Sequence, residues 1–325
     1  MSLILVTGAN GFIGRPLCEE LLYRGHRVRA AVRSPTRMPE GVEAIEAGDI
    51  DGTTDWTVAL QGVDTIIHLA ARVHVMKETS TDPLAEFLKV NLHGTENLAR
   101  QAVHAGVKRF VYASSIKVNG EQTAGTQSFS ENNQTDPQDH YGVSKWQAEQ
   151  ALHRIANETG LEIVIVRPPL VYGPGVKGNF IRLLGAIDKG TPLPLAGAHN
   201  ARSMIYVGNL VDALIACATH SAAAEQTYLV SDGEDVSTAR LANKIAIALG
   251  RGSSSFYFPP CLLRVVARLL GRAEQMDRLF GSLRINDEKI RSELAWIPPY
   301  TMEQGLHITA DWYHSQRNGY NHGTS

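Results

Sequence analysis

The N-terminal sequence Leu3-Ile-Leu-Val-Thr7 is an apolar strand that runs directly into the glycine-rich turn Gly8-Ala-Asn-Gly-Phe-Ile-Gly14. The three glycines permit a tight turn and let backbone amides approach a pyrophosphate at the positive end of the next helix. A glycine triplet alone can mark a plain strand-to-helix turn, but this one opens a βαβ unit. It predicts a dinucleotide site that includes Gly8, Asn10, Gly11, Phe12, Ile13 and Gly14.

Further short runs rich in β-branched residues lie at 27–32, 65–69, 110–114 and 163–167, with helical periodicity between them. This is the βαβ rhythm of a parallel sheet. We therefore predict an α/β protein with a Rossmann doubly wound parallel sheet. Two long helices are expected beside it, one from Pro83 to Gly106 and one from about Pro137 to Gly160.

The length of 325 residues leaves room for a second, smaller module. A passage rich in glycine and proline after Arg167 marks the departure from the sheet. We predict a nucleotide-binding Rossmann domain at 1–174 and a smaller, mostly helical C-terminal substrate domain at 175–202 and 233–314. Residues 203–232, with short strands at 205–207 and 227–230, are expected to return to the first domain. The tail 315–325 is expected to fray.

Composition excludes several classes of protein. A net charge of -2 offers no diffuse attraction to nucleic acid or anionic lipid. The apolar stretch 256–270 is interrupted by two arginines and is too short to span a bilayer, so an amphipathic helix over a substrate site is expected. The N-terminus lacks the pattern of a signal peptide. The scattered cysteines fit a reducing, cytoplasmic location; they are Cys18, Cys217 and Cys261.

A basic turn follows the second strand, where NAD-binding folds carry an acidic residue about 20 positions past the glycines. Arg33 occupies that position, and Ser34 and Arg37 follow it. Guanidinium groups suit a 2′-phosphate, so NADP(H) is favoured over NAD as cofactor. The alternative is a solvated basic turn without a ligand.

Tyr141 and Lys145 stand four residues apart on the second long helix, so their side chains face the same cleft. A nearby ammonium stabilises tyrosinate and brings the pKa of the tyrosine toward the range of a general acid. Ser115 follows the strand 110–114, at the edge of a parallel sheet where ligands bind. It is placed to hydrogen-bond the reacting oxygen. No metal site is expected, because histidines such as His68 and His74 lack the spacing of ligand pairs.

Together, the glycine turn, Tyr141-Gly-Val-Ser-Lys145 and Ser114-Ser115 resemble the extended short-chain dehydrogenase/reductases over nearly the whole chain. The C-terminal half resembles their nucleotide-sugar epimerase, dehydratase and reductase branch. The resembling segments are Arg167-Pro168, Val171-Tyr-Gly-Pro-Gly175, Asn179-Phe180, and Arg202 before Ile205-Tyr-Val207.

The resemblance implies roles for individual residues. Tyr141 would be the general acid/base, Lys145 would tune it and hold the nicotinamide ribose, and Ser115 would orient the substrate. Asn91 would complete a proton path, although a buried amide that distorts its helix is an equal alternative. Further cofactor contacts would come from Asp49, Ile50, Leu69, Ala70, Ala71, Pro168 and Val171. Substrate contacts would come from His74, Lys117, Asn179, Arg202 and Arg284.

The sequence also departs from the branch. Dehydratases place an Asp-Glu pair after the serine, whereas Ser115 is followed by Ile116 and Lys117, so dehydration is not expected. His140 stands where proline is common, and Gly208 where an acidic residue is common. Neither change is explained by the sequence.

Three functions remain open. The sequence around Ser115 resembles that of NADPH-dependent 4-ketoreductases that act on a UDP-linked 4-keto-6-deoxy-N-acetylhexosamine for surface-polysaccharide (O-antigen) synthesis, and this resemblance favours reduction. A nucleotide-sugar 4-epimerase with tightly bound NAD would use the same residues. A non-catalytic NADP-binding regulator is disfavoured because it would not need the acid. The resemblance also implies a homodimer in which the two long helices pair between subunits.

Overall fold

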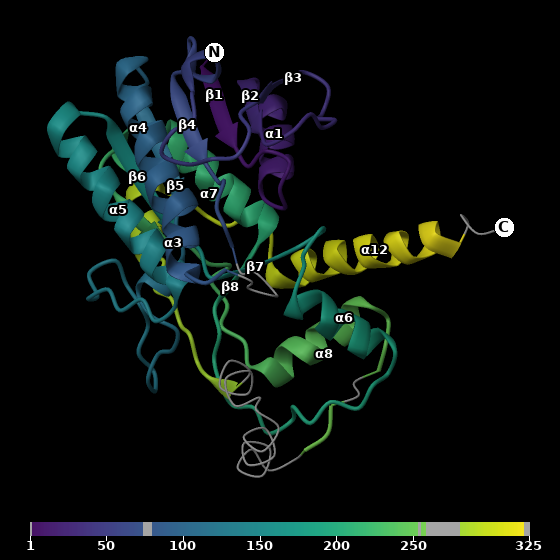
Figure 1. Cartoon of the computed structure of the whole chain (residues 1–325). Helices are drawn as coiled ribbons and strands as arrows, with labels where there is room; N and C mark the ends of the chain where they lie inside the picture. The colour runs from purple at the N-terminus through teal and green to yellow at the C-terminus, as the bar shows by residue number, and fades with distance from the viewer. Residues whose placement is uncertain (1, 74–79, 253–254, 258–279, 322–325) are drawn as a thin grey trace.

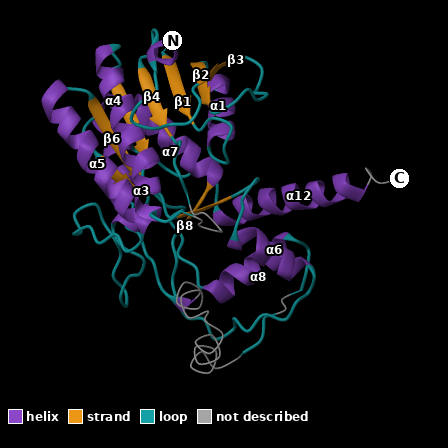
Figure 2. Ribbon diagram, in the orientation of Figure 1, coloured by secondary structure: helices purple, strands orange, loops and turns teal. Residues whose placement is uncertain are grey.

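The structure, a computed structural model, describes residues 2–73, 80–252, 255–257 and 280–321. Its centre is a parallel sheet of seven strands in the order β3-β2-β1-β4-β5-β6-β9 (Figures 1 and 2). The strands are β1 (Leu3–Thr7), β2 (Arg27–Val32), β3 (Val42–Glu46), β4 (Thr65–His68), β5 (Arg109–Ala113), β6 (Glu162–Arg167) and β9 (Thr227–Leu229). The strand order reverses between β1 and β4, which places a ligand crevice at their carboxyl ends. The predicted Rossmann sheet is confirmed.

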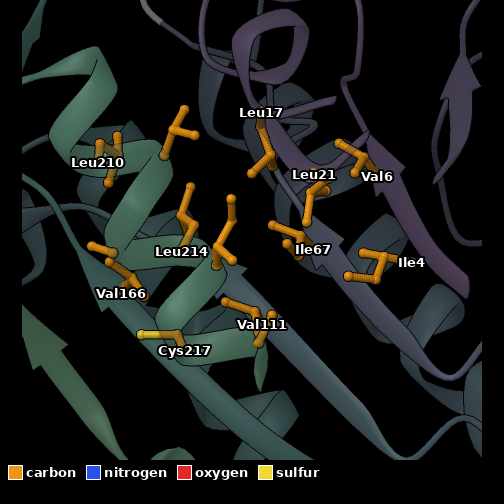
Figure 3. Packing of buried hydrophobic residues seen from close by; sticks show 14 of the residues in the cluster. Ile4, Val6, Leu17, Leu21, Ile67, Val111, Val166, Leu210, Leu214 and Cys217 are labelled. Atoms are coloured by element: carbon orange, nitrogen blue, oxygen red, sulfur yellow. The ribbon is translucent and has the colours of Figure 1, made fainter. Parts of the chain in front are cut away.

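Alternate residues of the central strands pack against helices on opposite faces of the sheet. Ile4 and Val6 face a cluster that contains α1 (Gly14–Tyr23), α7 (Val207–Thr219) and α11 (Glu288–Leu294). Figure 3 shows Leu17 and Leu21 of α1, with Leu210 and Leu214 of α7, over that face. The other face packs against α2 (Thr57–Leu60), α4 (Thr95–His104) and α5 (His140–Thr159). Burial on both faces explains the nearly continuous apolar runs of these strands.

The first predicted long helix is built from three consecutive segments. They are α3 (Pro83–Leu88), the π-helical turn η1 (Lys89–Gly94) and α4. Asp82 caps α3, since its side chain accepts from the amide of Ala85 at 3.0 Å. The second predicted helix is α5, which ends at Gly160 in a left-handed conformation.

The smaller module packs around its own apolar cluster. It contains the helices α6 (Asn179–Asp188), α8 (Thr238–Ala248) and α12 (Met302–Asn321), and the parallel strand pair β7 (Leu170–Tyr172) and β8 (Met204–Tyr206). The expected strand at 205–207 therefore pairs with β7 and not with the main sheet. In contrast, α7 packs on the main sheet and β9 joins it beside β6. The domain boundaries themselves stay a prediction.

The sequence predicts a tail that frays from residue 315. In the structure α12 continues to Asn321, and the fraying stays a prediction. Its last turns are tied to α6 by an ion pair between Arg317 and the buried Asp188. The Arg317 guanidinium also lies 5.8 Å from the centre of the Tyr313 ring. These contacts stabilise the helical form of this polar segment, whose polarity alone does not predict a helix.

None of the described helices is long and apolar enough to cross a membrane. Most of the apolar stretch 256–270 lies outside the described residues. Cys18 and Cys217 are free and buried, and burial raises the pKa of each thiol to about 12. Cys261 lies outside the described residues.

Candidate active site

Two positions of the glycine-rich turn after β1 have room only for glycine. Gly8 adopts a φ of +65°, and a Cβ there would lie 2.9 Å from the amide nitrogen of Ala70. A Cβ on Gly14 would lie 2.2 Å from the carbonyl oxygen of Gly8. No side chain caps the start of α1, so the N-terminal amides of this helix suit the pyrophosphate of a dinucleotide. The predicted residues of this turn are therefore brought together, and their ligand contacts stay a prediction.

The carboxyl end of β4 is fixed to this turn by buried polar contacts. Oγ1 of Thr7 lies 2.7 Å from Nδ1 of His68, and it accepts from the amides of Leu69 and Ala70 at 3.2 Å each. Nε2 of His68 lies 2.9 Å from the hydroxyl of Thr95. Burial, together with the charge of Lys145, lowers the pKa of His68 to about 3. His68 is therefore a neutral packing residue. Among the described residues, no cluster of three or more His, Cys, Asp or Glu side chains could hold a metal ion.

The expected adenosine end of the site lies where β2 and β3 finish. Nε of Arg33 lies 3.1 Å from Oδ1 of Asp49, and both side chains are about four-fifths exposed. The parallel pairing of Val32 with Glu46 explains why residues from different strands meet here. Ser34 and Arg37, which follow Arg33 in the sequence, are exposed. Ile50 packs against the apolar cluster between the sheet and the helices α2, α4 and α5. The contact between Arg33 and Asp49 was not foreseen.

Ser115 and Tyr141 meet above the carboxyl end of β5. Ser115 caps a short 3-10 turn, η2 (Ile116–Val118), and accepts from the amide of Lys117 at 3.3 Å. Tyr141 is the second residue of α5. Lys145 lies one turn later, where Nζ donates to the carbonyl of Ala113 at 2.8 Å and lies 5.9 Å from the Tyr141 ring centre. The predicted trio is therefore one cluster at the edge of the sheet.

The electrostatics of this cluster come mainly from burial, and they raise the pKa of Tyr141, opposite to the direction that the sequence predicted from Lys145. Burial raises the pKa of Tyr141 and the charge of Asp139 adds to this, while a side-chain hydrogen bond with Ser115 lowers it. Burial lowers the pKa of Lys145 to about 7, against the opposing charge of Glu149. A tyrosine and a lysine with displaced pKa values in one crevice are typical of an acid/base site.

Asn91 lies in the π-helical turn η1 and is fully buried. Its amide group accepts from the backbone nitrogen of Arg72 at 2.8 Å and donates to the Arg72 carbonyl at 3.0 Å. It also donates to the hydroxyl of Ser144 on α5 at 2.9 Å. Asn91 thus joins a helical distortion to the loop after β4. Its role in a proton path stays a prediction.

A buried charged network that the sequence did not reveal lies one turn along α5 from Lys145. Glu149 accepts from Arg167 at 3.0 and 2.5 Å, and from the hydroxyl of Ser114. Arg167 also donates to Oδ1 of Asn119 at 3.0 Å. The available signal was the spacing of four residues between Lys145 and Glu149, which puts both on one face of α5.

A family model for the NAD dependent epimerase/dehydratase family matches residues 4–231. This chain belongs to that family. It is 40% identical over 317 residues to a UDP-glucose 4-epimerase of Vibrio cholerae, with 97% of this chain and 96% of the relative covered. It is 29% identical to a 3-beta-hydroxysteroid dehydrogenase of Mycolicibacterium neoaurum, with 95% and 91% covered. The solved structure of MoeE5 in complex with UDP-glucose and NAD superimposes with a TM-score of 0.77 at 28% identity, with 97% and 99% covered.

Among the expected substrate residues of this epimerase/dehydratase chain, two arginines lie on neighbouring backbone segments. Arg202 forms backbone bridges with Val236 and Leu283, and it donates to the carbonyl of Gly281 at 3.0 Å. Arg284, which follows Leu283 in the sequence, donates to Asp235 at 2.7 Å.

The other expected contacts are distributed around them. Asn179 is exposed at the start of α6, Lys117 is held by carboxylates near Ser115, and His74 lies outside the described residues. The carbonyl of Pro168 accepts from the amide of Ile116 at 3.0 Å, and Val171 lies in β7.

The structure explains Gly208, where the family commonly has an acidic residue. A Cβ there would lie 2.6 Å from the ring of Tyr206 and 3.1 Å from that of Tyr300, whose rings pack edge-on. The same glycine lines a groove of about 860 Å³ between α1, α7 and α12, which Asn10, Gly11 and Phe12 of the glycine turn also line. His140 is exposed at the first position of α5, and nothing in the structure explains it.

Proposed function

We propose that this protein is a UDP-hexose 4-epimerase that uses NAD. The observation that carries the proposal is the cluster of Ser115, Tyr141 and Lys145 at the carboxyl edge of a Rossmann sheet. The 40% identity to a UDP-glucose 4-epimerase over nearly the whole chain supports 4-epimerisation. The similarity to MoeE5 with bound UDP-glucose and NAD supports this substrate class and cofactor. The sequence alone had favoured reduction, and the comparison shifts the preference.

Bound NAD would supply the acceptor and donor of the hydride at the sugar C4. Tyr141, as the tyrosinate, would take the proton of the C4 hydroxyl while the hydride leaves C4, and it would return that proton to the same oxygen when the hydride comes back to the opposite face of C4. Ser115 would hydrogen-bond the same oxygen and keep it near Tyr141. Lys145, protonated on part of the molecules near its pKa of about 7, would stabilise the tyrosinate. The uncapped start of α1 would hold the pyrophosphate.

The second candidate is NADPH-dependent reduction of a UDP-linked 4-keto-6-deoxy-N-acetylhexosamine. It is favoured by Arg33 and Arg37 beside the expected ribose position. The ion pair of Arg33 with Asp49 is highly exposed, so a 2′-phosphate could replace that carboxylate at small cost. Replacing both arginines with glutamine should then weaken NADPH binding by about 2 to 4 kcal/mol and leave NADH binding nearly unchanged. Equal losses of both cofactors in a titration would remove the NADP assignment.

The deciding experiment compares two reactions of the purified protein. UDP-glucose without added cofactor should be converted to UDP-galactose, and the nicotinamide released on denaturation should be NAD. A UDP-4-keto-6-deoxy-N-acetylhexosamine with NADPH should cause no net loss of reduced nicotinamide. Net NADPH oxidation without epimer formation would establish the reductase instead. Oxidation of a 3β-hydroxysteroid, with both sugar reactions silent, would overturn both candidates.

We also propose that the protein is a homodimer built through α4 and α5. The large apolar side chains that are exposed among the described residues, such as Tyr23, Ile247 and Ile297, do not lie on these helices. The proposal therefore rests on the family resemblance and not on an excess of apolar surface. Light scattering at micromolar concentration should report twice the mass of 35.4 kDa. A monomer at that concentration would contradict it.

A further inference from the structure

Lys117 occupies the position where dehydratases of this family carry an acidic catalytic residue. In this chain its side chain is engaged by two neighbouring carboxylates. Its ammonium forms ion pairs with the carboxylate of Asp139 and, at 3.1 Å, with Glu121. All three side chains are about one-third exposed or less. The positive charge is thus engaged by this chain's own carboxylates beside the crevice.

Asp139 connects this ion pair to the catalytic helix. Its Oδ1 caps α5 by accepting from the amide of Gly142 at 2.7 Å, while Oδ2 contacts Lys117. A Cβ on Gly142 would lie 3.0 Å from the carbonyl oxygen of Lys117, so glycine permits this close approach of the two segments. The turn that begins at Ser115 and the helix turn that carries Tyr141 are therefore fastened at one point.

We propose that Lys117 is a positioning residue for Tyr141: by holding Asp139, it clamps the turn of Ser115 onto the first turn of α5 and offsets the negative charge nearest the tyrosine. The inference rests on the proposed acid/base function of Tyr141. It reassigns Lys117, which the sequence marked as a substrate contact. The charge of Asp139 raises the pKa of Tyr141, so losing the ammonium should raise that pKa further.

Several other titratable, charged and aromatic groups lie around Tyr141, directly or through Phe87, and they must stay unchanged in the test. Lys145 lies on its own helix, and Tyr112 approaches from β5. From α3, the ring of Phe87 lies 6.3 Å from that of Tyr141, and Arg72 stacks on Phe87 while lying 4.0 Å from Glu86. None of these groups is altered in the variants below.

The test follows the pH dependence of turnover in five variants. Lys117→Met should move the tyrosine-dependent limb upward by about half a pH unit, a small shift because the pair is partly solvated. Asp139→Asn should move it downward, since asparagine keeps the helix cap without the charge. The double variant should return the midpoint close to that of the wild type. Lys117→Arg should match the wild type, as should Lys89→Met, which breaks an exposed pair with Asp51 elsewhere.

The outcomes separate the possible roles. A higher KM for the sugar nucleotide in Lys117→Met with an unchanged midpoint would show that Lys117 binds substrate and would overturn the inference. Loss of rate without a shift, unrelieved in the double variant, would show a purely structural role and would also overturn it. Wild-type protein inactive on every UDP-sugar would refute the proposed function instead. The Tyr141 titration would then be followed by ¹³C NMR of labelled tyrosine, where the same order of midpoints is expected.

Discussion

Glu149→Ala should destabilise the fold by about 3 to 5 kcal/mol, because it leaves a buried guanidinium without its carboxylate. The side chains of Glu149 and Arg167 are 1% and 7% exposed, so water cannot replace the lost partner. Arg167 would retain Asn119 as an acceptor, but Ser114 would also lose the acceptor of its hydroxyl. Urea unfolding followed by tryptophan fluorescence measures the loss directly.

The matched control lies two turns further along α5. Glu158 is 56% exposed and pairs with Arg100 at 3.5 Å, so Glu158→Ala should cost less than about 0.5 kcal/mol. Pairing Glu149→Ala with Arg167→Met should recover part of the loss, since no buried charge then remains unpaired. Equal, small losses for Glu149→Ala and Glu158→Ala would refute the reasoning, because burial would then have no energetic consequence.

Three further outcomes are expected. Tyr141→Phe should lower turnover at least about a hundredfold in steady-state kinetics, with cofactor affinity nearly intact in a fluorescence titration; retained activity would contradict the acid/base role. Lys145→Met should raise the free energy of unfolding below pH 7, because burial lowers the pKa of Lys145 to about 7 from an unfolded value of 10.5. That gain should shrink as the pH rises toward about 10, and a gain that grew would refute the assignment. Gly208→Ala should cost about 1 to 3 kcal/mol in urea unfolding through its contact with Tyr206, whereas Gly252→Ala, with nothing within 4 Å, should be nearly neutral.

The sheet and the grouping of Ser115, Tyr141 and Lys145 could be predicted because their signals are local. An apolar run before three glycines predicts β1 and its turn, and a spacing of four predicts that Tyr141 and Lys145 share a helix face. The edge strand β3 was missed because its residues are intermediate or exposed and two of its five are glutamates. Such a strand lacks the apolar pattern that marks the buried ones.

The long-range contacts could not be predicted from the sequence. Arg33 and Asp49 meet only because β2 and β3 pair in a register that no local pattern specifies. Glu149 and Arg167 are 18 residues apart, and charged residues are so seldom buried that no local pattern predicts this pair. In each case the position of the side chain depends on a partner that is distant in the sequence, and a local pattern does not identify that partner.

The geometry of the trio also limits what it can reveal about the reaction. Gly142 lets the first turn of α5 approach the carbonyl of Lys117, and this approach places Tyr141 beside Ser115 in the same way for an epimerase or a reductase. Both reactions require one hydroxyl to exchange a proton at C4, so the cluster serves either. The outcome must depend on how firmly the nicotinamide is retained and on whether the keto-sugar has room to turn. We expect retention to depend on the exposed ion pair of Arg33 and Asp49, which the sequence predicts to lie at the adenosine end of the cofactor. For this reason the cofactor that remains bound through purification discriminates between the two reactions better than any substitution within the trio.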